Sequence, residues 1–161
     1  MIPSQTYRDV PGSLTAAAAT NATAATTIDT WDANGRPFEH CTLYLEHAAA
    51  TATDSSAKWT GARVLEGATT SISSATAISG LTGTTNSTAT STQFVLPAHN
   101  DTTNACIIRI DMPLLTRGRY LFVETTSSAD TVATRKRAVL TRGQETPDSA
   151  TELGAVTMVQ L

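Results

Sequence analysis

The segment from residue 40 to residue 46, HCTLYLE, alternates between polar and apolar side chains. Cys41, Leu43 and Leu45 fall on one side of an extended chain, and the residues between them fall on the other. Successive side chains of a β-strand point to opposite faces of its sheet, so this pattern predicts a strand buried on one face only. Such a strand needs a second layer against its apolar face, which favours a sheet packed on another layer of structure.

Further strand-like runs recur along the chain, separated by turn signals such as DANG at residues 32–35. About thirty residues are threonine, a β-branched residue that suits a pleated surface better than a helix. The pattern predicts an all-β protein, an antiparallel two-sheet β-sandwich of roughly eight strands with a jelly-roll-like arrangement. The other expected strands contain the runs TTIDTW, AKWTGARVLEG, STQFVLPA, NACIIRIDM, YLFVETT, TVATRKRAVLTR and AVTMVQL.

The chain has 161 residues, a length that suits one domain. Residues 1–14, interrupted by Pro3 and Pro11, are expected to form an extended N-terminal arm, and residues 15–161 a single β-sandwich domain. The stretch 67–92, rich in Ser, Thr, Ala and Gly, is either a long surface excursion or a weakly packed pair of strands.

The charge balance and hydropathy argue against two classes of partner. The net charge of −3 and the pI of about 5.5 provide no positive field that would attract DNA or RNA, so we expect no nucleic-acid partner. No run approaches the roughly 18 apolar residues of a membrane span, and the first residues do not resemble a signal peptide. Cys41 and Cys106 lie in apolar runs and are expected to be buried thiols, with a bridge between them as the alternative.

No set of residues has the spacing of a metal or catalytic site. His40 and His47 are seven residues apart, which places them on opposite faces of one strand, and His99 lies in a distant loop. The DANG segment lacks the glutamate that closes a calcium loop. Residues 55–58, SSAK, match the Ser-x-x-Lys pattern of penicillin-binding enzymes, but its partner motifs are absent. We therefore expect no metal, no cofactor and no enzymatic activity.

Basic side chains concentrate in the last third of the chain, and two interpretations of them stay open. They protect the edge of a strand against aggregation, or they form an interface that binds carboxylates of a partner protein. DNA contact is less favoured because aromatic residues are not interleaved with them. The candidate protein-interface residues are Arg117, Arg119, Arg135, Lys136, Arg137 and Arg142.

Two segments, RIDMPLLTRGRYLFVETT and RAVLTRGQETPDSATELG, resemble the C-terminal half of small β-sandwich proteins encoded beside the major capsid protein of tailed bacteriophages. SATAISGL at residues 74–81 is similar to a linker that precedes the central strands in that family. One departure is MPLL after Asp111, where the family pattern predicts a tighter hairpin. The matching features are Asp111, the turn 117–119, the strand start 120–121, the ending 140–142 and the tail 147–154.

The resemblance implies a capsid decoration, or cement, protein on the outer capsid surface of a virion, assembled in the host cytoplasm. Such a protein binds the major capsid protein, bridges neighbouring subunits and stabilises the shell, and it commonly forms a homotrimer or homodimer. The alternative is a head fibre, spike or carbohydrate-binding module in which Trp31, Trp59 and Tyr44 stack on sugar rings. Burial of the two tryptophans would count against that alternative.

Overall fold

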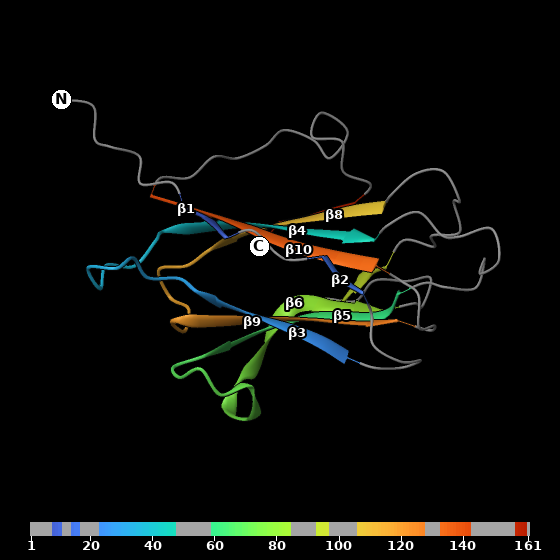
Figure 1. Cartoon of the computed structure of the whole chain (residues 1–161), viewed down its shortest axis with the longest axis horizontal. Coiled ribbons are helices and arrows are strands. Elements are labelled where there is room, and N and C mark those ends of the chain that lie inside the picture. Colours follow the sequence, from blue (N-terminus) through green and yellow to red (C-terminus); the bar gives the residue numbers. More distant parts are fainter. Residues whose placement is uncertain are drawn as a thin grey trace.

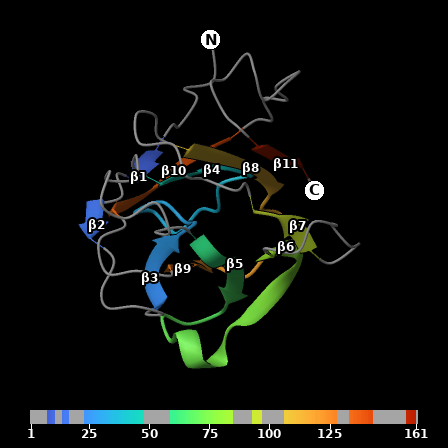
Figure 2. The ribbon, with the colours of Figure 1, turned by 90° about the vertical axis from the view of Figure 1, so that its right-hand side faces the viewer.

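The computed structural model describes residues 8–10, 14–16, 23–47, 59–84, 93–96, 106–127, 133–142 and 157–160. In this part of the chain the regular structure consists of β-strands and one short 3-10 turn, η1 (Ile72–Ser74). The strands form two sheets that lie one above the other (Figures 1 and 2). The predicted all-β sandwich of two sheets is therefore confirmed.

We call the upper layer of Figure 2 sheet A and the lower layer sheet B. Sheet A has the order β1, β10, β4, β8, β11, with β2 also paired to β10, and sheet B has the order β3, β9, β5, β6, β7. The strands of sheet A are β1 (Arg8–Val10), β2 (Leu14–Ala16), β4 (His40–His47), β8 (Cys106–Pro113), β10 (Ala133–Thr141) and β11 (Thr157–Gln160). The strands of sheet B are β3 (Thr23–Asp29), β5 (Trp59–Gly67), β6 (Thr76–Thr84), β7 (Gln93–Val95) and β9 (Tyr120–Ser127).

Strands from the two halves of the chain pair in a nested order. β10 pairs with β1 and β2, β9 with β3, β8 with β4, and β6 with β5, all antiparallel. Two edge pairs depart from the expected antiparallel arrangement, because β11 joins β8 and β7 joins β6 in parallel. Distant segments thus lie side by side, and the chain crosses between the sheets at the ends of the strands.

The alternation seen in the sequence of β4 produces the core. Cys41, Leu43 and Leu45 are almost fully buried between the sheets, as the period of two predicted. Cys41 lies opposite Met112, whereas Cys106 lies opposite His47 at the other end of β4, so both thiols are free and the alternative of a bridge is wrong. Burial, with a smaller contribution from the Asp111 charge, raises the pKa of Cys41 to about 12.

Two expectations about segments are refined by the structure. Residues 8–10 form an edge strand on β10 and do not leave the sandwich, because the outer edge of β10 offers unsatisfied backbone groups. Residues 1–7 and 11–13 of the expected arm lie outside the described residues. In the stretch 67–92, β6 buries Ile78 and Leu81, which favours the strand interpretation for residues 76–84.

The MPLL segment lies where the chain crosses from sheet A to sheet B. Strands β8 and β9 belong to different sheets, so the tight hairpin expected from the family pattern does not form. Leu114 is buried, with its N–H donated to the Glu39 carbonyl at 2.8 Å, whereas Leu115 is 73% exposed. The extra residues span the gap between the sheets, which is about 10 Å in a packed pair of sheets.

Gly118 closes this crossing by lying directly against the backbone of Gly67. A Cβ atom at Gly118 would come within 2.8–3.0 Å of three backbone atoms of Gly67. Backbone atoms cannot rotate away as a side chain can, so only glycine fits without a shift of β5 or of the turn.

We expect Gly118→Ala to lower the free energy of unfolding by about 1–3 kcal/mol, because the new methyl group overpacks two backbones. Gly61→Ala is the matched control, since its Cβ would meet Thr126 at an ordinary 3.7 Å. Denaturant unfolding midpoints of the two variants test the expectation. Equal midpoints would mean that the crossing adapts freely and that the glycine contact does not fix it.

Candidate functional site

The six basic residues predicted to form an interface occupy three separate places. Three lie at the end of the sandwich where the chain crosses between the sheets, two lie on the outer face of sheet A, and one points into the core. These are, in that order, Arg117, Arg119 and Arg142; Arg135 and Arg137; and Lys136. The structure therefore does not bring all six side chains into one patch.

Arg119 connects the start of β9 to the end of β3. Its guanidinium group donates two hydrogen bonds to Asp29, at 3.0 and 2.8 Å, in a bidentate pair that raises the pKa of Arg119. The same group lies 5.0 Å from the ring centroids of both Trp31 and Tyr120. The Arg119 carbonyl also accepts hydrogen bonds from the backbone N–H and hydroxyl of Thr30.

Arg117 and Gly118 share one carboxylate. The backbone N–H of Gly118 donates to Glu66 at 2.8 Å, and Arg117 donates to the other Glu66 oxygen at 3.4 Å. The Arg117 side chain is 23% exposed, so little of it faces solvent. Glu66 thereby ties the crossing turn to β5.

Arg142 holds the turn that joins β3 to β4. It donates to Asp32 at 2.6 Å and lies 5.1 Å from the Phe38 ring centroid. Asp32 also accepts from Arg36 and from the Asn34 backbone, and these hydrogen bonds, led by the one from Arg142, hold the pKa of Asp32 well below its usual range. DANG is thus a turn whose aspartate is occupied by arginines, which leaves no free carboxylate there for calcium.

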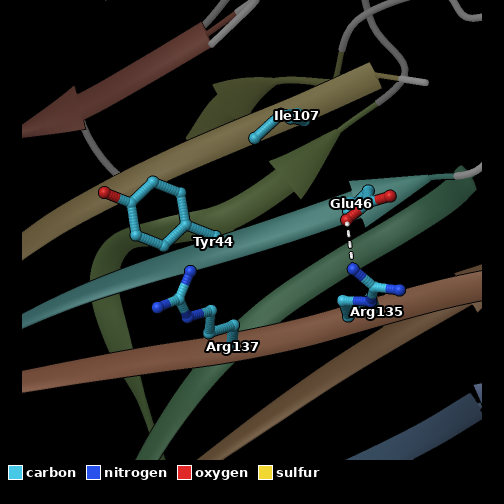
Figure 3. A pocket seen from close by; sticks show the side chains of 5 residues that line it. All are labelled: Tyr44, Glu46, Ile107, Arg135 and Arg137. Carbon is cyan, nitrogen blue, oxygen red and sulfur yellow. Dashed lines mark ion pairs between the residues drawn. The ribbon is translucent and has the colours of Figure 1, made fainter. Parts of the chain in front are cut away.

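Arg135 and Arg137 line a shallow hollow on the outer face of sheet A, which we call the sheet-A groove. The hollow measures about 310 Å³ and is lined by Tyr44, Glu46, Ile107, Arg135 and Arg137 (Figure 3). Arg137 lies opposite Tyr44, and Arg135 lies opposite Glu46, with 3.6 Å between charged atoms. Two arginines and one glutamate give the groove a net positive charge, and Tyr44 and Ile107 give it apolar surface.

A buried polar network on the same face supports Tyr44 from β8. Arg109 donates two hydrogen bonds to Asp111, at 2.7 and 3.0 Å, and Thr42 donates one at 2.7 Å. Burial alone would raise the pKa of Asp111, but the nearby His40 ring and the hydrogen bonds from Arg109 and Thr42 lower it to about 2. Arg109 also lies 5.7 Å from the Tyr44 ring centroid. Because Arg109, Asp111 and Thr42 bind one another, the network fixes Tyr44 on one side while Arg137 flanks the other.

The sequence identified the two arginines of the groove but not its other members. The alternation of β4 placed Tyr44 and Glu46 on the polar face, and that was the available signal. Ile107 gave none, because an apolar residue in an apolar run is indistinguishable from a core residue until the register with Glu46 is known.

Within the described residues, no three His, Cys, Asp or Glu side chains gather to hold a metal ion. His40 and His47 face opposite sides of β4, as their spacing predicted: His40 lies 3.6 Å from Asp111 on the outer face, and His47 contacts Trp59 in the core. Trp59 is 3% exposed and so cannot stack on a sugar. His99 and the SSAK segment lie outside the described residues.

Comparisons with known proteins found no matching family model, no matching curated protein and no matching solved structure. Among the described residues, no helix has the length and apolar character needed to cross a bilayer. The sheet-A groove has the composition of a protein-binding surface, with tyrosine and arginine around an apolar side chain.

Lys136 is the one predicted interface residue that points into the core. The residue is 4% exposed, and its ammonium group donates to the Val123 carbonyl at 3.1 Å. Burial lowers the pKa of Lys136 from 10.5 to about 8, against a smaller opposing effect of Glu124. Lys136 is thus positioned to affect stability and not to contact a partner.

The shifted pKa predicts how stability depends on pH. Between pH 8 and pH 10.5 the unfolded chain holds a proton on Lys136 that the folded chain has released, so the Lys136 contribution to stability rises with pH across this window. Below pH 8 Lys136 is protonated in both the folded and the unfolded chain, so the full free-energy cost of burying its charge is present. We expect the free energy of unfolding of the wild type, relative to Lys136→Met, to increase by about 3 kcal/mol from pH 7 to pH 10.5.

Urea unfolding of both proteins at several pH values measures this difference, and other titrating groups cancel in it. Arg137→Met, on the exposed neighbour, is the control and should show the pH dependence of the wild type. A difference between wild type and Lys136→Met that stays constant with pH would contradict the burial of a charged Lys136.

Proposed function

We propose that this chain is a non-enzymatic structural protein of a bacteriophage virion. It binds the outer surface of the capsid, bridges neighbouring subunits of the major capsid protein and stabilises the shell. The observation that carries the proposal is the sheet-A groove, where Tyr44, Arg135 and Arg137 stand on a rigid sheet face. The resemblance of the segments around Asp111 and Arg142 to capsid decoration proteins supplies the class of partner.

The nested strand pairs support a jelly-roll-like arrangement of the sandwich. In such a fold the first strands pair with the last, the next with the next-to-last, and the pairs alternate between two sheets. The pairs of β10, β9, β8 and β6 with their N-terminal partners follow this order. A rigid sandwich of this type suits a protein that must keep its shape on a shell under mechanical load.

The groove favours a partner that presents a carboxylate beside an apolar side chain. Arginine binds carboxylates through two parallel hydrogen bonds, and Arg137 is positioned beside the Tyr44 ring for such a contact. Binding the assembled shell better than free subunits would stabilise assembly by mass action. Several such contacts from one oligomer would add avidity without any new type of contact.

The arginines of the crossing end contribute differently. Arg117, Arg119 and Arg142 each bind a carboxylate of their own chain, so we assign them to holding the turns. A partner would have to displace those carboxylates or contact the remaining exposed part of each guanidinium group. Arg135 and Arg137 are exposed, whereas those three residues are half-buried, and capsid binding is assigned first to Arg135 and Arg137 on this ground.

A carbohydrate-binding module is the second candidate, and Tyr44 is the residue that favours it. A half-buried tyrosine beside a glutamate and two arginines can bind a sugar ring by stacking and hydrogen bonds. Trp59 contributes nothing to this, because it is buried. Binding to a glycan panel that is lost in Tyr44→Ala would support this candidate over the capsid.

Sedimentation with undecorated capsids of the phage tests the proposal. We expect the wild type to co-sediment at physiological salt and Tyr44→Ala/Arg137→Ala to bind at least about tenfold more weakly, since central tyrosine and arginine contacts carry much of the energy of an interface. Arg63→Ala is the control, because Arg63 is an exposed arginine on the opposite sheet. Failure of the wild type to sediment would reject the function, and unchanged binding of the double variant would reject the groove.

A further inference from the structure

Most edges of the two sheets are formed by very short strands. An edge strand presents unpaired N–H and C=O groups, and proteins commonly limit this exposure by keeping edge strands short or interrupted. At the edges of sheet A, β1 and β2 have three residues each and β11 has four; at one edge of sheet B, β7 also has three. These edges offer little room for an added strand.

The part of β6 that extends beyond β7 is also an edge, and it is interrupted. Gly80 has a φ of 84°, which turns the strand out of the extended conformation. The pairing of β6 with β5 shifts register between Arg63 and Leu65. A bent strand with a shifted register is a poor template for a second chain.

β3 differs from all of these edges. It has seven residues, Thr23–Asp29, and all seven pair with β9 in one unbroken register. On its other side β3 pairs with no strand of the described part of the chain, and Figure 2 shows it at the edge of sheet B. Residues 23–28 include no charged residue and no proline, two of the features that commonly protect an edge.

We propose that β3 is the surface through which two copies of this chain dimerise. The two strands run antiparallel about a two-fold axis at Thr26, so that the two five-stranded sheets B join into one continuous sheet. This register is the one that pairs all seven residues, with Ala25 opposite Thr27 of the partner subunit and Thr23 opposite Asp29 of the partner subunit. A two-fold contact is closed, which limits the assembly to a dimer.

The charge of β3 favours a second copy over a strand of unrelated sequence. Because residues 23–28 are uncharged, β3 cannot attract a basic or an acidic strand of another protein. It can pair with β3 of a second copy without placing like charges opposite each other. Asp29, the only charged residue of β3, would face an uncharged threonine and is already bound by Arg119. Backbone hydrogen bonds would then supply affinity, as in other cases of strand addition.

This dimer does not depend on the proposed function, and it leaves the sheet-A groove of each copy uncovered. The groove lies on the outer face of sheet A, and β3 lies at the edge of sheet B. A dimer would thus carry two grooves, and a shell with repeated binding positions would bind both together.

Light scattering coupled to size-exclusion chromatography, over a concentration series, tests the dimer. Ala25 and Thr27 have exposed side chains on β3, so Ala25→Lys/Thr27→Lys places lysines opposite each other only in the dimer. We expect a dimeric wild type and a dissociation constant at least about tenfold higher for this variant. Ala77→Lys/Ser79→Lys puts the same charges, at the same spacing, on exposed positions of β6 and should remain dimeric.

A charge exchange tests the register. Ala25→Glu/Thr27→Glu alone should also dimerise at least about tenfold more weakly than the wild type, and an equal mixture with the lysine variant should form heterodimers. Thermal melting of each variant confirms that it is folded, which separates loss of pairing from loss of structure. A monomeric wild type, equal effects at β3 and β6, or a mixture that stays monomeric would each overturn the proposal.

Discussion

The burial of the inner face of sheet A against the inner face of sheet B is the interaction on which the rest of the structure depends. Each strand has only two faces, so a residue that enters the core fixes the direction of both of its neighbours. In β4, burying Leu43 and Leu45 turns Tyr44 outward, where the groove lies. The apolar pattern thus determines the position of the candidate binding residues although none of them belongs to the core.

The basic residues show how exposure divides similar side chains into different roles. An ion pair that stays partly in water contributes on the order of 1 kcal/mol or less, so no single arginine at the crossing end is expected to hold the fold. Arg119 and Arg142 nevertheless each add contacts with aromatic rings, and together with Arg117 they hold the turns and strand ends at one end of the sandwich. Lys136 is the opposite case, since its burial costs stability at neutral pH.

The sequence was informative where one strand could be interpreted by itself. The alternation in β4 identified Cys41, Leu43 and Leu45 as core and Tyr44 as outward-facing. It was uninformative where the answer depended on register between distant strands, as for Ile107 beside Glu46. Lys136 was assigned to the surface together with its basic neighbours, although the period of two from Leu140 and Ala138 already indicated an inward position, and the pairing with Leu45 places it inside. The MPLL departure from the family's tighter hairpin could be noted from the sequence but not explained, because a local pattern cannot say that two consecutive strands belong to different sheets.

The nested order of the strands has a consequence for the sequence of folding events. The partners Leu65 and Ala77 are close along the chain, whereas Arg8 and Leu140 close almost the whole of it. Loop-closure entropy makes contacts between distant residues slow to form, so we expect the β5–β6 hairpin to appear early and β1 to dock last. On a ribosome the strands β1 and β2 would emerge first, and they would stay unpaired until β10, their partner strand, had been synthesised. The edge strand β1 would therefore be among the first strands to be synthesised and the last to pair with its neighbour.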